Sequence, residues 1–213
     1  MKEFQEILGQ EAGKRAIEIA LAGKHDLFLI GIPNIGKTML IKTAKSLGIP
    51  NMPKLTESET CTCGYYGDTH TECTCSLAKI KRFRKKASWK NALMTICMSR
   101  VYYDKMRVGF EGEPSIIIKD RILETRKFQQ SRIADKLNCD YDNVDIKEHC
   151  QICDSSQALY RRAIDVLSMT TAQYQNSLKV ARTIADLDNS KDIGVCHVAE
   201  SIQYHYINRS YNY

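Results

Sequence analysis

Gly31-Ile32-Pro33-Asn34-Ile35-Gly36-Lys37-Thr38 is the stretch that decides the fold, because it matches the P-loop pattern of two glycines separated by four residues and followed by Lys and Thr. The apolar run before it, residues 27–30, predicts a buried strand, and residues 37–47 after it predict a helix. In such an arrangement the strand delivers the loop and the N-terminus of the helix faces an anion. The sequence therefore predicts an α/β fold with a phosphate-binding loop.

We expect each part of this loop to meet a different part of a nucleotide. Backbone N–H groups of residues 31–36 would surround the β-phosphate, Lys37 would bridge the β- and γ-phosphates, and the Thr38 hydroxyl would bind Mg²⁺. The predicted ligands are therefore ATP and Mg²⁺. The alternative is a chance turn of Gly and Lys, and the flanking strand and helix argue against it.

The composition allows a packed core and indicates an intracellular location. The chain has 213 residues, 43% of them hydrophobic, and a formal net charge of +6. It contains no apolar stretch long enough to span a membrane, and residues 1–6 lack the apolar core of a signal peptide, so we expect a cytosolic (cytoplasmic) protein. The positive charge is local, with six basic residues in residues 79–86. This run fits either a phosphate-bearing partner or a solvated helix face.

The hydrophobic periodicity divides the chain into two parts. Gly112 and Pro114 indicate a boundary near residue 114. We expect residues 1–114 to form a nucleotide-binding domain and residues 115–213 to form an all-helical lid. Within these two domains the apolar spacing predicts helices at residues 10–22, 77–86 and 115–137, and several more between residues 144 and 207.

The polar segment of residues 54–76 carries two C-x-C pairs, Cys61 with Cys63 and Cys73 with Cys75. Disulfides are rare in a reducing compartment, so clustered cysteines indicate a metal site before they indicate bridges. Four thiolates from two short turns suit a closed, tetrahedral and structural Zn²⁺ site. The alternative is four reduced cysteines without a metal.

The other cysteines give weaker signals. Cys150 and Cys153 form a C-x-x-C pair that is either redox-active or made of buried thiols, which act as small hydrophobic side chains. We expect Cys97, Cys139 and Cys196 to lie in the core.

Several segments together resemble the magnesium-chelatase-like AAA+ ATPases of the ComM type. The matching stretches follow the family's order: residues 9–20 leading into the P-loop, residues 61–68 with 73–75 after them, and residues 178–187 with 197–204. The resemblance implies a truncated, AAA+-like P-loop NTPase core with a zinc-binding loop and a helical lid. Arg182 lies in the third stretch and is a candidate lid contact to the nucleotide, with packing of the lid as the alternative.

The resemblance also implies partners. Such proteins look like ring-forming motors, and ComM-type members are linked to DNA branch migration. The expected partners are therefore an adenine nucleotide, further copies of the chain or intact AAA+ ring subunits, and DNA, with no membrane.

Three parts of the family's catalytic machinery are not found in this sequence. The acid that holds Mg²⁺ belongs on a strand between the P-loop helix and the cysteine segment, and both this strand and the sensor strand look deleted. Asp120 ends the one other apolar run that carries an acid, in a segment that looks helical. Met94 and Ala172 stand where the two arginines are expected. A sheet of one or two strands buries its faces poorly. Either residues 87–118 supply replacement strands, or the first half of the chain is only marginally stable and a partner subunit completes it.

Three interpretations of function follow from these observations. The first is a protein that binds ATP or ADP and hydrolyses it poorly, with no catalytic residue assigned. The second is a non-enzymatic, zinc-containing module that binds DNA or ring subunits. The third is an active ATPase with a relocated acid.

Overall fold

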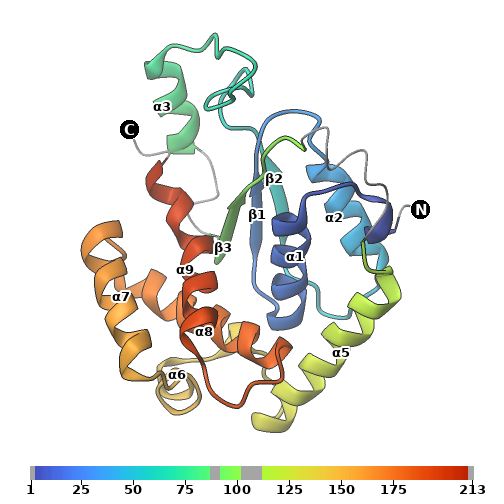
Figure 1. Ribbon diagram of the computed structural model, residues 1–213, viewed down its shortest axis with the longest axis vertical. Coiled ribbons are helices and arrows are strands. Elements are labelled where there is room, and N and C mark those ends of the chain that lie inside the picture. Colours follow the sequence, from blue (N-terminus) through green and yellow to red (C-terminus); the bar gives the residue numbers. More distant parts are fainter. Residues whose placement is uncertain (1–2, 87–91, 102–111, 211–213) are drawn as a thin grey trace.

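The computed structural model describes residues 3–86, 92–101 and 112–210, and their side chains up to residue 205 (Figure 1). Trp89 and its neighbours in residues 87–91 lie outside the described residues. Within the described part, no helix is both long enough and apolar enough to cross a membrane.

The centre of the molecule is a parallel sheet of three strands in the order β2-β1-β3. The strands are β1 (Leu27–Ile30), β2 (Leu55–Ser58) and β3 (Met94–Cys97). All four residues of β1 are buried, as expected for a central parallel strand that is covered on both faces. Leu27 and Leu29 join the main core, whereas Phe28 and Ile30 form a small cluster with Phe83 on the other face.

The sheet contains a strand where the sequence analysis expected none, while the truncated form of the core agrees with the short chain. A strand does lie between the P-loop helix and the cysteine segment, because β2 pairs in parallel with β1 from Leu27 opposite Leu55 to Ile30 opposite Ser58. The third strand, β3, comes from residues 87–118, as one of the two sequence-based alternatives required. Because β2 is polar, a pattern of apolar residues does not predict it as a strand. Its strand conformation comes from pairing with β1.

Helices surround this sheet. The helices that precede and follow β1 are α1 (Glu11–Gly23) and α2 (Lys37–Ser46), and both pack into the main core. The basic helix α3 (Leu77–Lys86) lies with the cysteine segment at the upper end of the molecule in Figure 1. One-turn 3-10 helices occur at Phe4–Glu6 and Asn138–Asp140.

The C-terminal part is helical, as predicted. Its helices are α5 (Ser115–Arg132), α6 (Asn143–His149), α7 (Asp154–Leu167), α8 (Thr171–Leu187) and α9 (Val195–Ser210). The main core crosses residue 114, since Ile122 of α5 and Ile184 of α8 belong to the same cluster as Leu27. A second cluster joins α6, α7, α8 and α9. The division into domains at residue 114 stays a prediction.

Buried polar groups also join the helical part to the sheet. The Arg126 guanidinium donates hydrogen bonds to the backbone carbonyls of Leu21 and Pro50, and burial lowers its pKa. In the lid, the Asp186 carboxylate is fully buried and accepts hydrogen bonds from Arg132, from Asn138 at 2.8 Å and from Arg182 at 3.0 Å. These donors surround one carboxylate, so its loss would leave buried cations uncompensated.

We expect Asp186→Ala to lower the free energy of unfolding by about 3–5 kcal/mol, because it breaks a buried ion pair by removing one partner. Urea unfolding followed by circular dichroism measures this change. Asp165→Ala is the matched control, since Asp165 is exposed on α7 and the same substitution should be nearly neutral there. Equal midpoints for the two variants would contradict the role given to Asp186.

Candidate functional site

The carboxyl ends of the three strands bring the candidate site together. Ile30 lies opposite both Ser58 and Cys97 in the sheet, so the segments that follow these residues leave the same edge. Two hydrogen bonds extend this pairing beyond the strands, from Gly31 N to Ser58 O at 3.2 Å and from Met98 N to Ile30 O at 2.7 Å. The P-loop therefore emerges between the end of β2 and the end of β3.

The P-loop lysine is buried and held by the loop itself. Its ammonium Nζ donates hydrogen bonds to the carbonyls of Gly31 at 2.9 Å and Ile32 at 2.6 Å. It also lies 3.6 Å from an oxygen of Glu59, so a carboxylate occupies the neighbourhood where phosphate oxygens are expected. Lys37 is thus positioned at the loop by the contacts of its own chain.

Two carboxylates face this loop, Glu57 within β2 and Glu59 directly after it, and the sequence analysis missed both. The Thr38 hydroxyl donates a hydrogen bond of 2.7 Å to Glu57, and Glu59 forms the ion pair with Lys37. A hollow of about 750 Å³ opens beside them. Its lining consists of Pro33, Asn34, Gly36, Lys37, Thr38, Met39, Glu57, Ser58, Glu59 and Phe83. The missed signal is that Glu57 lies in, and Glu59 directly after, a short segment that can pair with β1.

The other candidates for the missing machinery lie elsewhere. Asp120 is exposed on α5, in the helix that the sequence predicted. Met94 is buried at the start of β3, and Ala172 is exposed on α8. Among the described residues that line the hollow at the P-loop, there is no arginine.

The structure does not bring Arg182 to the P-loop. Its guanidinium is buried in the lid, where it donates to Asp186, to Lys191 O at 2.8 Å and to Ser190 O at 2.6 Å. These contacts match the packing alternative for Arg182, and its contact with a nucleotide stays a prediction.

A second, smaller hollow lies beside the end of β3. It measures about 330 Å³ and is lined by the start of α1 and by the segment after β3. The Gln10 side chain joins these parts, because its amide donates to Ile35 O at 3.1 Å and to Ser99 O at 2.8 Å. Gln10 therefore connects the smaller hollow to the P-loop at Ile35.

The four predicted metal ligands come together. All four sulfur atoms of Cys61, Cys63, Cys73 and Cys75 lie within 4.8 Å of one another. The Sγ–Sγ distances are 3.4 Å between Cys61 and Cys63, 3.5 Å between Cys63 and Cys73, and 3.7 Å between Cys61 and Cys73. Tetrahedral Zn²⁺ with bonds of about 2.3 Å places its sulfur ligands about 3.8 Å apart. The cluster therefore fits a closed four-thiolate metal site.

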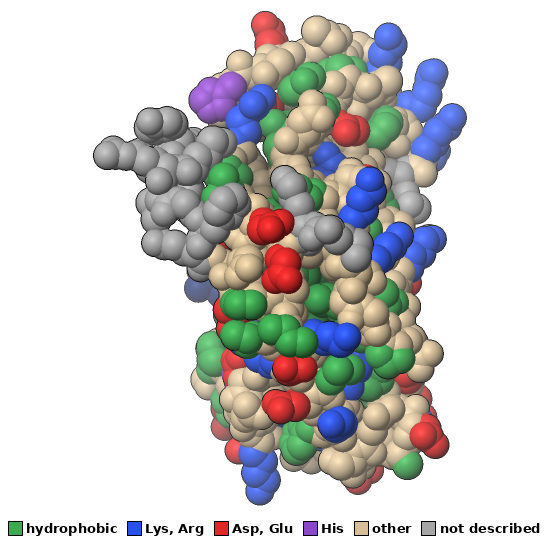
Figure 2. All heavy atoms as spheres, turned by 90° about the vertical axis from the view of Figure 1, so that its right-hand side faces the viewer, with side chains coloured by type: hydrophobic (Ala, Val, Ile, Leu, Met, Phe, Trp, Pro, Cys, Tyr) green, Lys and Arg blue, Asp and Glu red, His purple; other side chains and the backbone are tan. Residues whose placement is uncertain are grey.

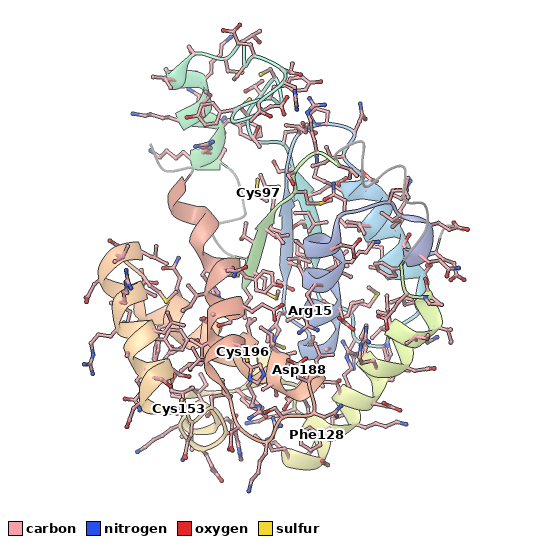
Figure 3. All side chains as sticks on the ribbon, viewed as in Figure 1. Arg15, Cys97, Phe128, Cys153, Asp188 and Cys196 are labelled. Carbon is pink, nitrogen blue, oxygen red and sulfur yellow. The ribbon has the colours of Figure 1, made fainter. Side chains whose placement is uncertain are left out.

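The remaining cysteines differ from one another in exposure. Burial raises the pKa of Cys150 to about 12, whereas hydrogen bonds from Ser155 and Ser156 lower the pKa of the exposed Cys153 to about 7. The expectation of a core position is wrong for Cys196, which is exposed on α9. Cys97 and Cys139 are half-buried. Figure 3 shows Cys153 and Cys196 far below the cysteine segment.

The basic helix α3 stands beside the cysteine segment. Its exposed cations are Lys79, Lys81, Arg82, Lys85 and Lys86. Arg84 is buried instead, with its guanidinium carbon 4.5 Å from the centre of the Tyr66 ring. Figure 2 shows basic side chains projecting from the upper end of the molecule, which α3 and the cysteine segment form in Figure 1.

Comparisons with known proteins match both parts of the chain. The family described as "Magnesium chelatase, subunit ChlI" matches residues 3–60, and the family described as "Magnesium chelatase, subunit ChlI C-terminal" matches residues 112–205. Competence protein ComM of Haemophilus influenzae is 32% identical over 96 residues, which are 45% of this chain and 19% of that protein. The uncharacterized protein YifB of Escherichia coli is 35% identical over 99 residues, which are 46% of this chain and 19% of YifB. The chain thus spans about a fifth of the length of these relatives.

We expect protein purified under reducing conditions to contain one Zn²⁺ per chain, because four thiolates complete the coordination of that ion. Elemental analysis measures the content. Replacing Cys61 and Cys73 by Ser should remove the metal, whereas Cys196→Ser, an exposed cysteine outside the cluster, should retain it. Metal-free wild type, or full metal content in the double variant, would contradict the site.

Proposed function

Because the chain belongs to the magnesium-chelatase-like family, we propose that it binds ATP or ADP with Mg²⁺ at residues 31–38 and hydrolyses ATP poorly. The observation that carries this proposal is the meeting of Lys37, Thr38 and Glu57 at one sheet edge. The P-loop supplies the phosphate contacts, and α2 directs its N-terminus toward the same space.

The phosphate chain would displace contacts that Lys37 now makes. The ammonium group of Lys37 is bonded to two loop carbonyls and lies near Glu59, so a small movement exchanges the carboxylate for phosphate oxygens. The smaller hollow would take the base, because Gln10 connects it to the loop at Ile35. The nucleotide would then bridge the two hollows.

Glu57 would be the acid on the metal side of the nucleotide. Its carboxylate accepts the hydroxyl hydrogen of Thr38, which leaves the Thr38 oxygen lone pairs free for Mg²⁺. A carboxylate in this position suits a cation that keeps several water molecules as ligands. This contact favours Glu57 over Asp120 as the acid, since Asp120 is exposed on α5.

Hydrolysis needs more than these contacts. Charge that develops on the transferred phosphoryl group is usually stabilised by an arginine, whose loss costs on the order of 10³-fold or more in rate. Met94 and Ala172 offer no charge in its place. Binding energy that is equal in the ground state and the transition state does not lower the barrier. Intact ring subunits that keep the arginine could supply it on assembly, whereas further copies of this chain carry Met94 at the same position.

A second candidate function is supported by α3. Its five exposed cations stand next to the cysteine cluster, at one end of the molecule. A polyanion such as DNA would be attracted to this surface, with an affinity that falls as salt rises. This function would be non-enzymatic and is compatible with nucleotide binding at the sheet edge.

We expect isothermal titration calorimetry to show that the protein binds MgATP. In the same sample, the rate of phosphate formation from ATP should be near background. Lys37→Ala should weaken binding by about tenfold to a hundredfold, because it removes the charge that faces the phosphates. Lys42→Ala is the control, since Lys42 is exposed on the same helix and carries the same charge. Equal affinity of wild type and Lys37→Ala for MgATP would contradict the proposal.

Glu57→Gln should weaken nucleotide binding in Mg²⁺ and leave binding in chelator-free buffer without Mg²⁺ unchanged, because the carboxylate acts through the metal. Asp120→Asn should change neither value. Titrations with and without Mg²⁺ make the comparison. If wild type shows steady turnover that both Lys37→Ala and Glu57→Gln abolish, the chain is an active ATPase with a relocated acid and the expectation of poor hydrolysis is wrong.

A further inference from the structure

The first turn of the cysteine cluster packs directly on the P-loop. Gly64 lies between Cys63 and Tyr65 and has φ +88°, a conformation that favours glycine. A Cβ atom on Gly64 would lie 2.7 Å from Pro33 and 2.4 Å from Glu59. Only a residue without a side chain therefore allows this turn to approach the loop so closely.

Glu59 connects this turn to the P-loop lysine. One of its oxygens lies against Gly64, and the other lies 3.6 Å from the ammonium group of Lys37. The next residue, Thr60, is buried and donates a hydrogen bond of 2.9 Å to Gly64 O. Cys61 follows directly in the chain. The position of Glu59 is thus set between the sheet and the cysteine turn.

A second contact ties the cysteine segment to the opposite side of the site. Asp68 accepts two hydrogen bonds from Arg100, at 2.9 Å and 2.7 Å, and Arg100 also donates to Thr71 at 3.1 Å. The Arg100 guanidinium holds the pKa of Asp68 well below its usual range. Arg100 lines the smaller hollow together with Gln10. The cysteine segment therefore touches both borders of the nucleotide site.

We propose that a thiophilic divalent cation in the four-cysteine cluster controls nucleotide affinity, with Gly64 as the positioning residue that transmits its effect to Pro33 and Glu59. This inference rests on the proposed nucleotide site. The segment between β2 and α3 has few apolar residues of its own, so the metal supplies the cross-links that keep its turns in place. Without the cation the turn at Gly64 loses its fixed position, and the loop loses its support.

Coupling of this kind acts in both directions. If the cation raises nucleotide affinity by some factor, the nucleotide raises cation affinity by the same factor. The two effects can be measured independently, and their agreement separates true linkage from damage caused by removing the metal.

The experiment compares zinc-loaded wild type, wild type stripped by a chelator, and stripped protein given Zn²⁺ again. Titration with MgADP avoids turnover. We expect stripping to weaken MgADP binding by about tenfold or more, and Zn²⁺ to restore it. Competition with a chromophoric chelator should show Zn²⁺ affinity rising by the same factor when MgADP is present.

Two glycine variants test the route. Gly64 and Gly67 both have positive φ, +88° and +84°, so alanine is strained at either position. A Cβ at Gly67 meets nothing within 4 Å, whereas one at Gly64 meets Pro33 and Glu59. Gly64→Ala should therefore keep its zinc and bind MgADP about tenfold more weakly, and Gly67→Ala should stay within about twofold of wild type.

The possible outcomes are distinct. Equal MgADP affinity of loaded and stripped wild type overturns the linkage and leaves the nucleotide site standing. Zinc-loaded wild type that shows no MgADP binding sensitive to Lys37→Ala overturns the nucleotide site and the linkage with it. Wild-type affinity in a zinc-containing Gly64→Ala protein overturns the route through Gly64. The comparison of loaded with stripped wild type decides the linkage even if a glycine variant does not fold.

Discussion

The parallel pairing of β1 on both of its sides is the interaction on which the rest of the structure depends. Strands in register end at one edge, so the P-loop, Glu57 and Glu59 at the end of β2 and the segment after β3 meet at that edge. A shift of one residue in β2 would turn Glu57 away from Thr38, because side chains alternate between the faces of a strand. The candidate site is therefore a consequence of strand register.

So small a sheet is stable here because the helical part completes its core. Ile122, Ile184 and Tyr204 join the cluster around β1, and Arg126 satisfies backbone carbonyls of Leu21 and Pro50. A three-stranded sheet alone buries little apolar surface. The helices that the family resemblance describes as a lid thus also supply the wall against which the sheet packs.

The two candidate ligand sites share structural elements. The chain passes from β2 through Glu59 and Thr60 into Cys61, so a residue that faces the P-loop lysine is two positions from a candidate metal ligand. In the proposed function, binding and catalysis would depend on different residues. The P-loop and Glu57 would contact the ground-state phosphates and the metal, while Met94 and Ala172 would add no charge to stabilise a transition state.

The sequence by itself determined the features that depend on neighbours along the chain. The P-loop, its flanking strand and helix, the helices after residue 114 and the two C-x-C pairs all follow from local spacing, because helical periodicity and ligand pairs span only a few residues. Tertiary structure decided the rest. β2 is polar and becomes a strand only against β1, so Glu57 and Glu59 became visible as site residues only in the fold. The exposure of Cys196, the burial of Arg182 and the contact of Gly64 with Pro33 likewise depend on partners distant in sequence, which local patterns do not encode.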